Sequence, residues 1–159
     1  MKILLIEDEK LLADSLKTLL TSKGFQVTAN SLMELIGNSS QVFIMGHKMA
    51  DLDAVGAAMG INCMCRKKGI KSYIVLDLEK NASEKLLEEI QAVPECNGLF
   101  ISGQEALLQC DSRSTLVVVD TNRPDQVEFR PLLESVPKVC VVDHHRRAGF
   151  CGCGRLFPL

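Results

Sequence analysis

Short aliphatic runs recur along the chain, and segments with helical spacing separate them. The runs typical of strands buried on both faces are residues 3–6, 42–45, 72–76, 99–101, 116–119 and 139–142. Apolar residues recur at three- and four-residue spacing over 54–66 and 83–93. This alternation predicts an α/β fold: a three-layer sandwich with a mostly parallel sheet and helices on both faces.

The first thirty residues repeat this pattern on a smaller scale. A strand at 3–6, an apolar helical stripe over 11–20 and a strand at 25–28 predict a β-α-β unit. A capping box, Ser31-x-x-Glu34, predicts that the next helix starts at Ser31 and ends before residues 37–40. We expect the first strand to extend the main parallel sheet. Homodimerisation is the expected way to cover its edge if that edge stays unpaired.

Composition narrows the class of protein. The chain has 159 residues, of which 47% are hydrophobic and 24% charged, and these values favour one soluble globular body. A net charge of -2 gives no general basic field, so we expect no duplex nucleic acid partner. The sequence has neither an apolar run of membrane-spanning length nor a signal peptide, so we expect a cytoplasmic protein with no membrane partner.

The seven cysteines are expected to be reduced thiols. Cys63-x-Cys65 and Cys151-x-Cys153 leave a zinc site as an alternative, although ligand pairs usually have two or more residues between them. The glycine-rich tail, residues 149–159, has no periodicity and predicts an irregular segment without an assignable role.

The candidate chemistry lies where three predicted strands end. His47, Asp51 and Asp53 follow the strand at 42–45, and Asp120 follows the strand at 116–119. The strand at 139–142 runs into Asp143-His144-His145-Arg146-Arg147. Ligands bind beyond the carboxyl ends of parallel strands, so these groups are expected at one edge of the sheet. Imidazole and carboxylate together suit Mn²⁺ or Mg²⁺, and three such strand ends suffice for a two-metal site.

Each motif also has an ordinary structural explanation. Asp51 and Asp53 are well placed to cap the helix predicted near Ala54. His144 and His145 fit hydrogen-bonded residues at a strand end, and the two arginines after them fit a solvated turn. The metal hypothesis therefore depends on whether the motifs converge.

The three motifs also resemble a known family. Gly46-His47-x-x-x-Asp51-x-Asp53, Val118-Val119-Asp120 and Val141-Val142-Asp143-His144-His145-Arg146-Arg147 resemble the first three motifs of the DHH phosphoesterase superfamily. The resemblance covers about residues 31–147 and is most similar to the catalytic subdomain of bacterial cyclic-di-AMP phosphodiesterases. It implies a catalytic subdomain over residues 31–148, a manganese cofactor with magnesium as the alternative, and a phosphodiester or cyclic dinucleotide substrate.

The resemblance also implies a role for each residue. His47 and Asp51 would hold one metal ion, Asp53 and His144 would hold a second, and Asp120 would bridge the two. Its catalytic group would be Asp120, His144 and His145. His145 and Arg146 would contact the substrate phosphate, and Asp143 would orient the histidines.

The sequence departs from the family pattern at both ends. The family has a fourth motif with a further aspartate, followed by a glycine-rich domain, and residues 149–159 resemble neither. We therefore expect weak or absent activity. Residues 1–30 resemble the start of an OmpR-type response-regulator receiver, with Glu7 and Asp8 as its acidic pair, but Asp51 belongs to the His47 motif rather than to a phospho-acceptor site.

Three functions stay open at this point. The chain is an incomplete DHH phosphodiesterase, a non-enzymatic chimera that binds metal or phosphate, or a receiver-type signalling module. Convergence of the metal-type side chains would separate the first two from the third.

Overall fold

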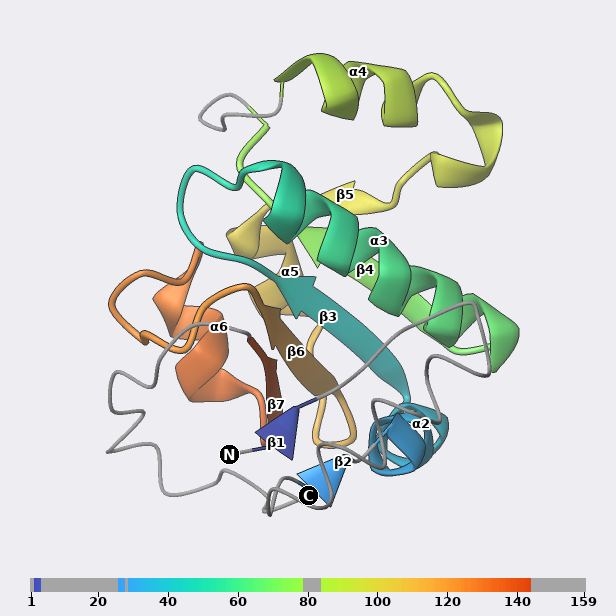
Figure 1. The fold of residues 1–159 in the computed structure, drawn as a ribbon, viewed down its shortest axis with the longest axis vertical. Helices are drawn as coiled ribbons and strands as arrows, with labels where there is room; N and C mark the ends of the chain where they lie inside the picture. Colours follow the sequence, from blue (N-terminus) through green and yellow to red (C-terminus); the bar gives the residue numbers. More distant parts are fainter. Residues whose placement is uncertain (1, 4–25, 28, 79–83, 144–159) are drawn as a thin grey trace.

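Two parallel sheets make up the strand content that the structure describes. A computed structural model describes residues 2–3, 26–27, 29–78 and 84–143. The main sheet holds β3 (Gln41–Met45), β4 (Lys71–Val75), β5 (Phe100–Ile101), β6 (Thr115–Val119) and β7 (Lys138–Val142) in the order β5-β4-β3-β6-β7 (Figure 1). All of its pairings are parallel. The predicted α/β class with a parallel sheet is therefore confirmed.

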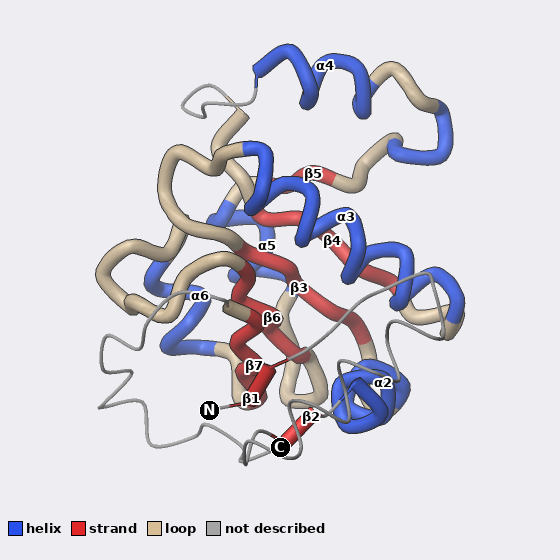
Figure 2. Tube along the Cα trace, in the orientation of Figure 1, coloured by secondary structure: helices blue, strands red, loops and turns tan. Residues whose placement is uncertain are grey.

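Helices follow the strands and cover both faces of the sheet. They are α2 (Ala29–Gly37), α3 (Leu52–Lys67), α4 (Glu84–Gln91), α5 (Gly103–Gln109) and α6 (Arg130–Ser135), with a short 3-10 turn, η1 (Pro94–Cys96) (Figure 2). In Figure 1, α3 lies in front of the strands and α5 lies behind them. None of the helices in the described part of the chain combines the length and apolar character that crossing a bilayer requires.

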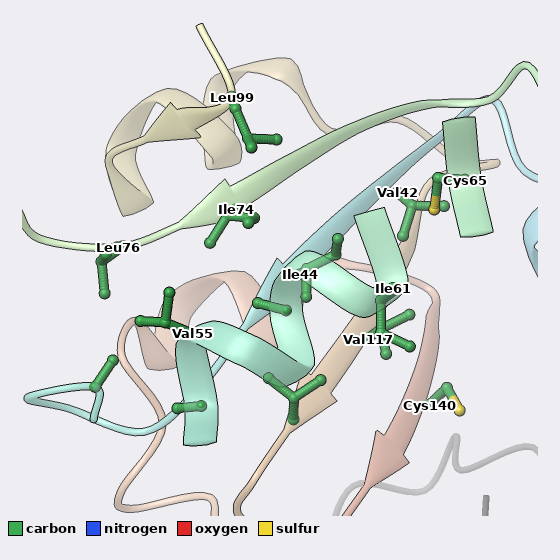
Figure 3. Close-up of a cluster of buried hydrophobic side chains, with 14 of the residues drawn as sticks. Val42, Ile44, Val55, Ile61, Cys65, Ile74, Leu76, Leu99, Val117 and Cys140 are labelled. Carbon is green, nitrogen blue, oxygen red and sulfur yellow. The ribbon is translucent and has the colours of Figure 1, made fainter. Parts of the chain in front are cut away.

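Each face of the sheet has its own apolar cluster. On one face, α3 packs against the buried side chains that β3, β4 and β6 direct toward it (Figure 3). The labelled residues there include Val55, Ile61 and Cys65 from α3 and Ile44, Ile74 and Val117 from the sheet. On the other face, Ala106 of α5 and Leu132 and Leu133 of α6 belong to the cluster that includes Phe43 and Leu116. Burial on both faces explains why these strands are almost continuously aliphatic.

The strand order places a topological switch point between β3 and β6. From β3 the chain passes through α3 to β4 on one side, whereas β6 pairs with β3 on the other side. Met45, the last residue of β3, pairs with Val75 on one side and Val118 on the other. In open parallel sheets, the carboxyl end of such a switch point is where ligands bind. The strands that flank it precede His47 and Asp120.

The observed bounds of the elements differ from the predicted bounds in a few places. The start predicted at Ser31 is wrong: α2 begins at Ala29, so Ser31 lies inside the helix. Ala29 is a strong helix former, and helix starts shift easily by one or two residues. The helix predicted over 54–66 begins earlier, at Leu52, because Asp51 provides its N-cap.

In the part that the structure describes, the N-terminal strand does not join the main sheet. Its described part, β1 (Lys2–Ile3), pairs in parallel with β2 (Gln26–Val27) in a separate two-stranded sheet. The expected extension of the main sheet is therefore wrong, because β2 is the hydrogen-bonding partner of β1. The helix predicted over 11–20 and the tail at 149–159 lie outside the described residues, as do Glu7 and Asp8.

Candidate metal centre

The loop after β3 carries the first candidate ligand. Gly46 follows the last residue of β3 and lies close to α3: a Cβ built there would lie 3.2 Å from the Cβ of Ala54. That distance is tighter than ordinary van der Waals contact, so glycine lets the strand end approach the first turn of the helix. His47 follows immediately and forms an isolated antiparallel bridge with Val127.

Three predicted ligands converge at the switch point. His47 Nε2 lies 3.7 Å from Asp51 Oδ1 and 3.6 Å from Asp120 Oδ2. One ligand atom from each of these residues lies within 4.8 Å of the others. Among the described residues, these three form the cluster of histidine, cysteine and acidic side chains that is close enough to share one metal ion. The three residues come from the β3 loop, the N-cap of α3 and the end of β6. Of the residues in the first two motifs, the structure therefore brings together His47, Asp51 and Asp120.

The His47 ring is oriented as a metal ligand would be. Its Nδ1 lies 2.8 Å from the carbonyl oxygen of Lys48. A carbonyl can only accept, so Nδ1–H donates this hydrogen bond and the lone pair of neutral imidazole lies on Nε2. Metal-binding histidines commonly donate their second N–H to a backbone carbonyl in this way. An imidazole lone pair directed at two carboxylates fits a divalent cation.

Asp51 has two functions in this geometry. Its Oδ1 accepts hydrogen bonds from the backbone N–H groups of Asp53 (3.1 Å) and Ala54 (3.0 Å), which caps α3. The hydrogen bond from Ala54 is the main reason that the pKa of Asp51 lies below its usual value, and His47 in its protonated form would lower it further. The cap explanation is thus correct for Asp51, and it coexists with the convergence on His47.

Asp53 is exposed in the first turn of α3 and is not a member of the converging group. Its predicted role as a ligand of a second ion stays a prediction.

Asp120 is a buried carboxylate on a left-handed backbone. Its side chain is 7% exposed and its φ is +57°, a conformation that aspartate tolerates better than most residues. Its backbone N–H donates to the carbonyl oxygen of Val142 on β7 (3.0 Å), which fixes the peptide at the strand end. Met49, in the His47 loop, has a similar φ of +58°. Unusual backbone conformations of this kind are concentrated at functional sites.

The third motif is only partly described. Asp143 follows β7, and its Oδ2 accepts a hydrogen bond from Nδ2 of Asn122. His144, His145 and Arg146 lie outside the described residues, so their predicted roles stay predictions. Asn122 was not predicted as a site residue. Its position two residues after Asp120 is the only sequence signal that points to it.

Glu128 and Asp77 are two further residues that sequence reasoning missed. Glu128 Oε1 accepts a hydrogen bond from the backbone N–H of Asp77, just after β4 (3.1 Å). Burial is the main cause that raises the pKa of Glu128, and the nearby Asp77 carboxylate adds to the rise. The Asp77 N–H, the charge of Lys48 and the protonated form of His47 act in the opposite direction. No local motif marks Glu128, because only the fold brings it to His47.

The five cysteines that the structure describes do not form part of this group. Cys63 is exposed and Cys65 is buried, and their spacing of two residues on α3 turns them to different sides of the helix. Burial raises the pKa of the Cys65 thiol to about 11. Cys151 and Cys153 lie outside the described residues.

The fold and the site define a class: an α/β protein that gathers an imidazole and two carboxylates, the side chains of a candidate cation site, at the switch point of a parallel sheet. The family description "DHH family, N-terminal domain" matches residues 41–154, so the family motifs cover all of the candidate ligands. The chain belongs to the DHH family.

Curated relatives match most of the chain. The cyclic-di-AMP phosphodiesterase PdeA of Listeria monocytogenes serotype 1/2a (strain 10403S) is 37% identical over 125 residues, which cover 77% of this chain and 19% of that protein. The cyclic-di-AMP phosphodiesterase GdpP of Bacillus subtilis (strain 168) is 36% identical over 124 residues, with the same coverage. A membrane protein-large ribosomal subunit bL9 fusion protein of Onion yellows phytoplasma (strain OY-M) is 31% identical over 150 residues. The chain spans about a fifth of the length of these relatives.

Proposed function

We propose that the chain is the metal-binding part of a manganese-dependent phosphodiesterase that hydrolyses cyclic dinucleotides or short oligonucleotides. The observation that carries this proposal is the approach of His47 Nε2 to Asp51 and Asp120 at the switch point of the sheet. The relatives named as cyclic-di-AMP phosphodiesterases support a cyclic dinucleotide as substrate. Magnesium is the alternative cofactor.

In this proposal, some residues bind the metal ions and others bind the substrate. His47, Asp51 and Asp120 would hold the first cation, and Asp53 and His144 would complete a second site with Asp120 as the shared carboxylate. Bound cations would polarise the phosphoryl group and stabilise charge that develops on its oxygens. His145 and Arg146 would bind and orient the phosphate, and Asp143, held by Asn122, would orient the segment that follows β7.

Charge limits what this chain does by itself. Asp51, Asp53 and Asp120 supply three negative charges, whereas two divalent cations bring four positive ones. The second ion should therefore bind more weakly than the first, and in-line reaction also requires a substrate that is held in position. We expect slow turnover by the isolated chain.

The test is hydrolysis by the purified 159-residue chain with increasing manganese. Bis-para-nitrophenyl phosphate needs little positioning and has a good leaving group, so we expect slow manganese-dependent cleavage that His47→Ala abolishes. Cyclic di-AMP should be turned over near background. Lys67→Ala, at the opposite end of α3, is the matched surface control and should behave as the parent chain.

Three results would contradict the proposal in whole or in part. Cleavage that is the same in His47→Ala would place the activity elsewhere. Robust cyclic-di-AMP hydrolysis by the chain, lost in His47→Ala, would refute the slow-turnover part and keep the assigned site. Manganese binding without any hydrolysis would favour the non-enzymatic alternative.

A further inference from the structure

The segment 125–128 lies along the loop that carries His47. Backbone hydrogen bonds join the two from end to end: the Lys48 N–H donates to the carbonyl of Gln126 (2.8 Å), and the Glu128 N–H donates to the carbonyl of Gly46 (3.0 Å). Between these bonds, His47 and Val127 form their antiparallel bridge. The His47 loop therefore has a continuous backbone partner that is distant from it in sequence.

Other contacts fix the segment in place. The Gln126 N–H donates to the carbonyl of Arg123 (3.0 Å) and closes a turn, and the Val127 side chain is fully buried. The Lys48 ammonium donates to the carbonyl of Asp125 (3.2 Å). A segment held by a turn, a buried anchor and paired backbone groups is a rigid support rather than a loose connection.

Glu128 connects segment 125–128 to a second strand end, that of β4. Its backbone N–H binds the end of β3 through Gly46, and its carboxylate accepts the N–H of Asp77 at the end of β4. One residue thus links two neighbouring strand ends and also ends the segment that lies against His47. The half-buried position of Glu128 makes this carboxylate bond costly to lose, because the Asp77 N–H would need another partner.

The link reaches the His47 ring through Lys48. The Lys48 carbonyl accepts the Nδ1–H of His47, and the N–H of the same residue is held by Gln126. If the Lys48 backbone rotates, the acceptor moves away from Nδ1, and the ring loses the bond that leaves its lone pair on Nε2. The orientation of the ring therefore depends on how firmly segment 125–128 holds the Lys48 backbone.

We infer that Glu128 is a positioning residue: with segment 125–128 it fixes the tautomer and orientation of His47 for cation binding. The inference rests on the proposed function, because it gives His47 the role of a metal ligand. Glu128 itself contacts neither the ion nor the substrate in this scheme. It acts through the backbone of the His47 loop.

The first test compares two substitutions of Glu128 by calorimetry with manganese. Glu128→Ala removes the acceptor for the Asp77 N–H, and manganese affinity should fall about tenfold. This loss is within the range measured when residues that hydrogen-bond to metal ligands are mutated. Glu128→Gln keeps an acceptor oxygen and should restore most of that affinity. Glu134→Ala removes an exposed glutamate of α6, paired with Arg130, and should leave affinity unchanged. Melting temperatures of all variants identify any loss of folding.

The second test needs neither metal nor turnover. Long-range proton–nitrogen NMR reports the tautomer of each histidine ring, at about pH 8, above the ordinary imidazole pKa of about 6.5. The His47 signals are those missing from His47→Ala. They should report Nδ1–H in the parent chain and in Glu128→Gln, and a mixture of both tautomers in Glu128→Ala.

The two tests separate this inference from the proposed function. A Glu128→Ala variant that folds, keeps the Nδ1–H tautomer and binds manganese as the parent chain does would overturn the positioning role. Equal losses in Glu128→Gln and Glu128→Ala would also overturn it, since charge and not the Asp77 bond would then be responsible. Absence of hydrolysis would refute the proposed function and leave the NMR result unaffected.

Discussion

A single residue, Asp120, combines three unusual properties: burial, a negative charge and a left-handed backbone. Burial of a carboxylate is costly unless charged or hydrogen-bonding groups compensate for it, and His47 Nε2 lies 3.6 Å from this one. A cation between the two would interact favourably with the imidazole and the carboxylate alike. Together with the positive φ, a conformation that is concentrated at functional sites, this proximity supports the proposed role of Asp120 as a ligand.

Asp120→Asn isolates the charge of this residue. Asparagine tolerates the left-handed backbone equally well, so the fold should be preserved. Manganese affinity should fall by at least about tenfold. Loss of a residue that hydrogen-bonds to a metal ligand already costs that much, and loss of a ligand itself should cost no less. Calorimetry measures the affinity, and Asp111→Asn, before β6 at the other edge of the sheet, is the matched control. Unchanged affinity in Asp120→Asn would exclude Asp120 as a shared ligand.

Asp51 allows its cap and its charge to be separated. Asparagine caps helices about as well as aspartate, so Asp51→Asn should keep the stability of α3, whereas Asp51→Ala should cost about 1 kcal/mol of unfolding free energy. Both variants lose the carboxylate, so both should bind manganese more weakly. Urea denaturation and calorimetry measure the two effects. If Asp51→Asn binds manganese normally, Asp51 serves only as a helix cap.

The same residue predicts a pH dependence. The pKa of Asp51 is lower in the folded chain than its usual value, mainly through the hydrogen bond from Ala54. Its contribution to stability is therefore complete above the ordinary carboxyl pKa and is lost as the pH falls through the lowered value. Asp51→Asn should reduce the acid sensitivity of unfolding, which urea titrations over a series of pH values would detect.

At the scale of elements, α5 depends on a short local signal. Ser102 Oγ accepts the N–H of Glu105 (3.2 Å), and Glu105 Oε2 accepts the N–H of Ser102 (2.8 Å), which completes a capping box. Ser102→Ala should cost about 1 kcal/mol of unfolding free energy, and Ser102→Asp should cost much less because aspartate also caps. Urea denaturation measures both. An equal loss in the two variants would show that the hydroxyl does not act as a cap.

Periodicity predicted the strands well because each is a buried aliphatic run with one favourable conformation. Phe43, Ile44 and Leu116 are fully buried, and they lie in the strands that were predicted within one residue. Helices α5 and α6 have only seven and six residues, too few for a clear period, and neither was singled out. The N-terminal strand was placed in the wrong sheet, because its sequence does not say which edge it will meet.

The candidate site was predictable only where a motif sits beside a strand end. His47, Asp51 and Asp120 satisfy this condition, and the rule for parallel sheets brings them together. Glu128 accepts a hydrogen bond from Asp77, which is distant in sequence. Asn122 donates one to Asp143, which follows a different strand. Such contacts depend on the register between strands, which no local pattern encodes.

At the scale of the whole molecule, the site joins segments that the sheet brings together. An ion that binds only the folded chain should raise its stability by about 2.7 kcal/mol at a free concentration one hundred times the dissociation constant. Thermal unfolding should therefore shift upward with manganese in the parent chain and not in His47→Ala. An equal shift in both proteins would assign the stabilisation to other groups.

The pairing of β3 with β6 also has a consequence for the order of events during synthesis. His47 and Asp51 leave the ribosome long before Asp120, and they cannot form the complete site until β6 has paired with β3. That pairing is strongly non-local, and such contacts form late and slowly. Nascent chains that end before residue 120 should therefore bind the cation weakly. Tight metal binding would then report that β6 has paired with β3.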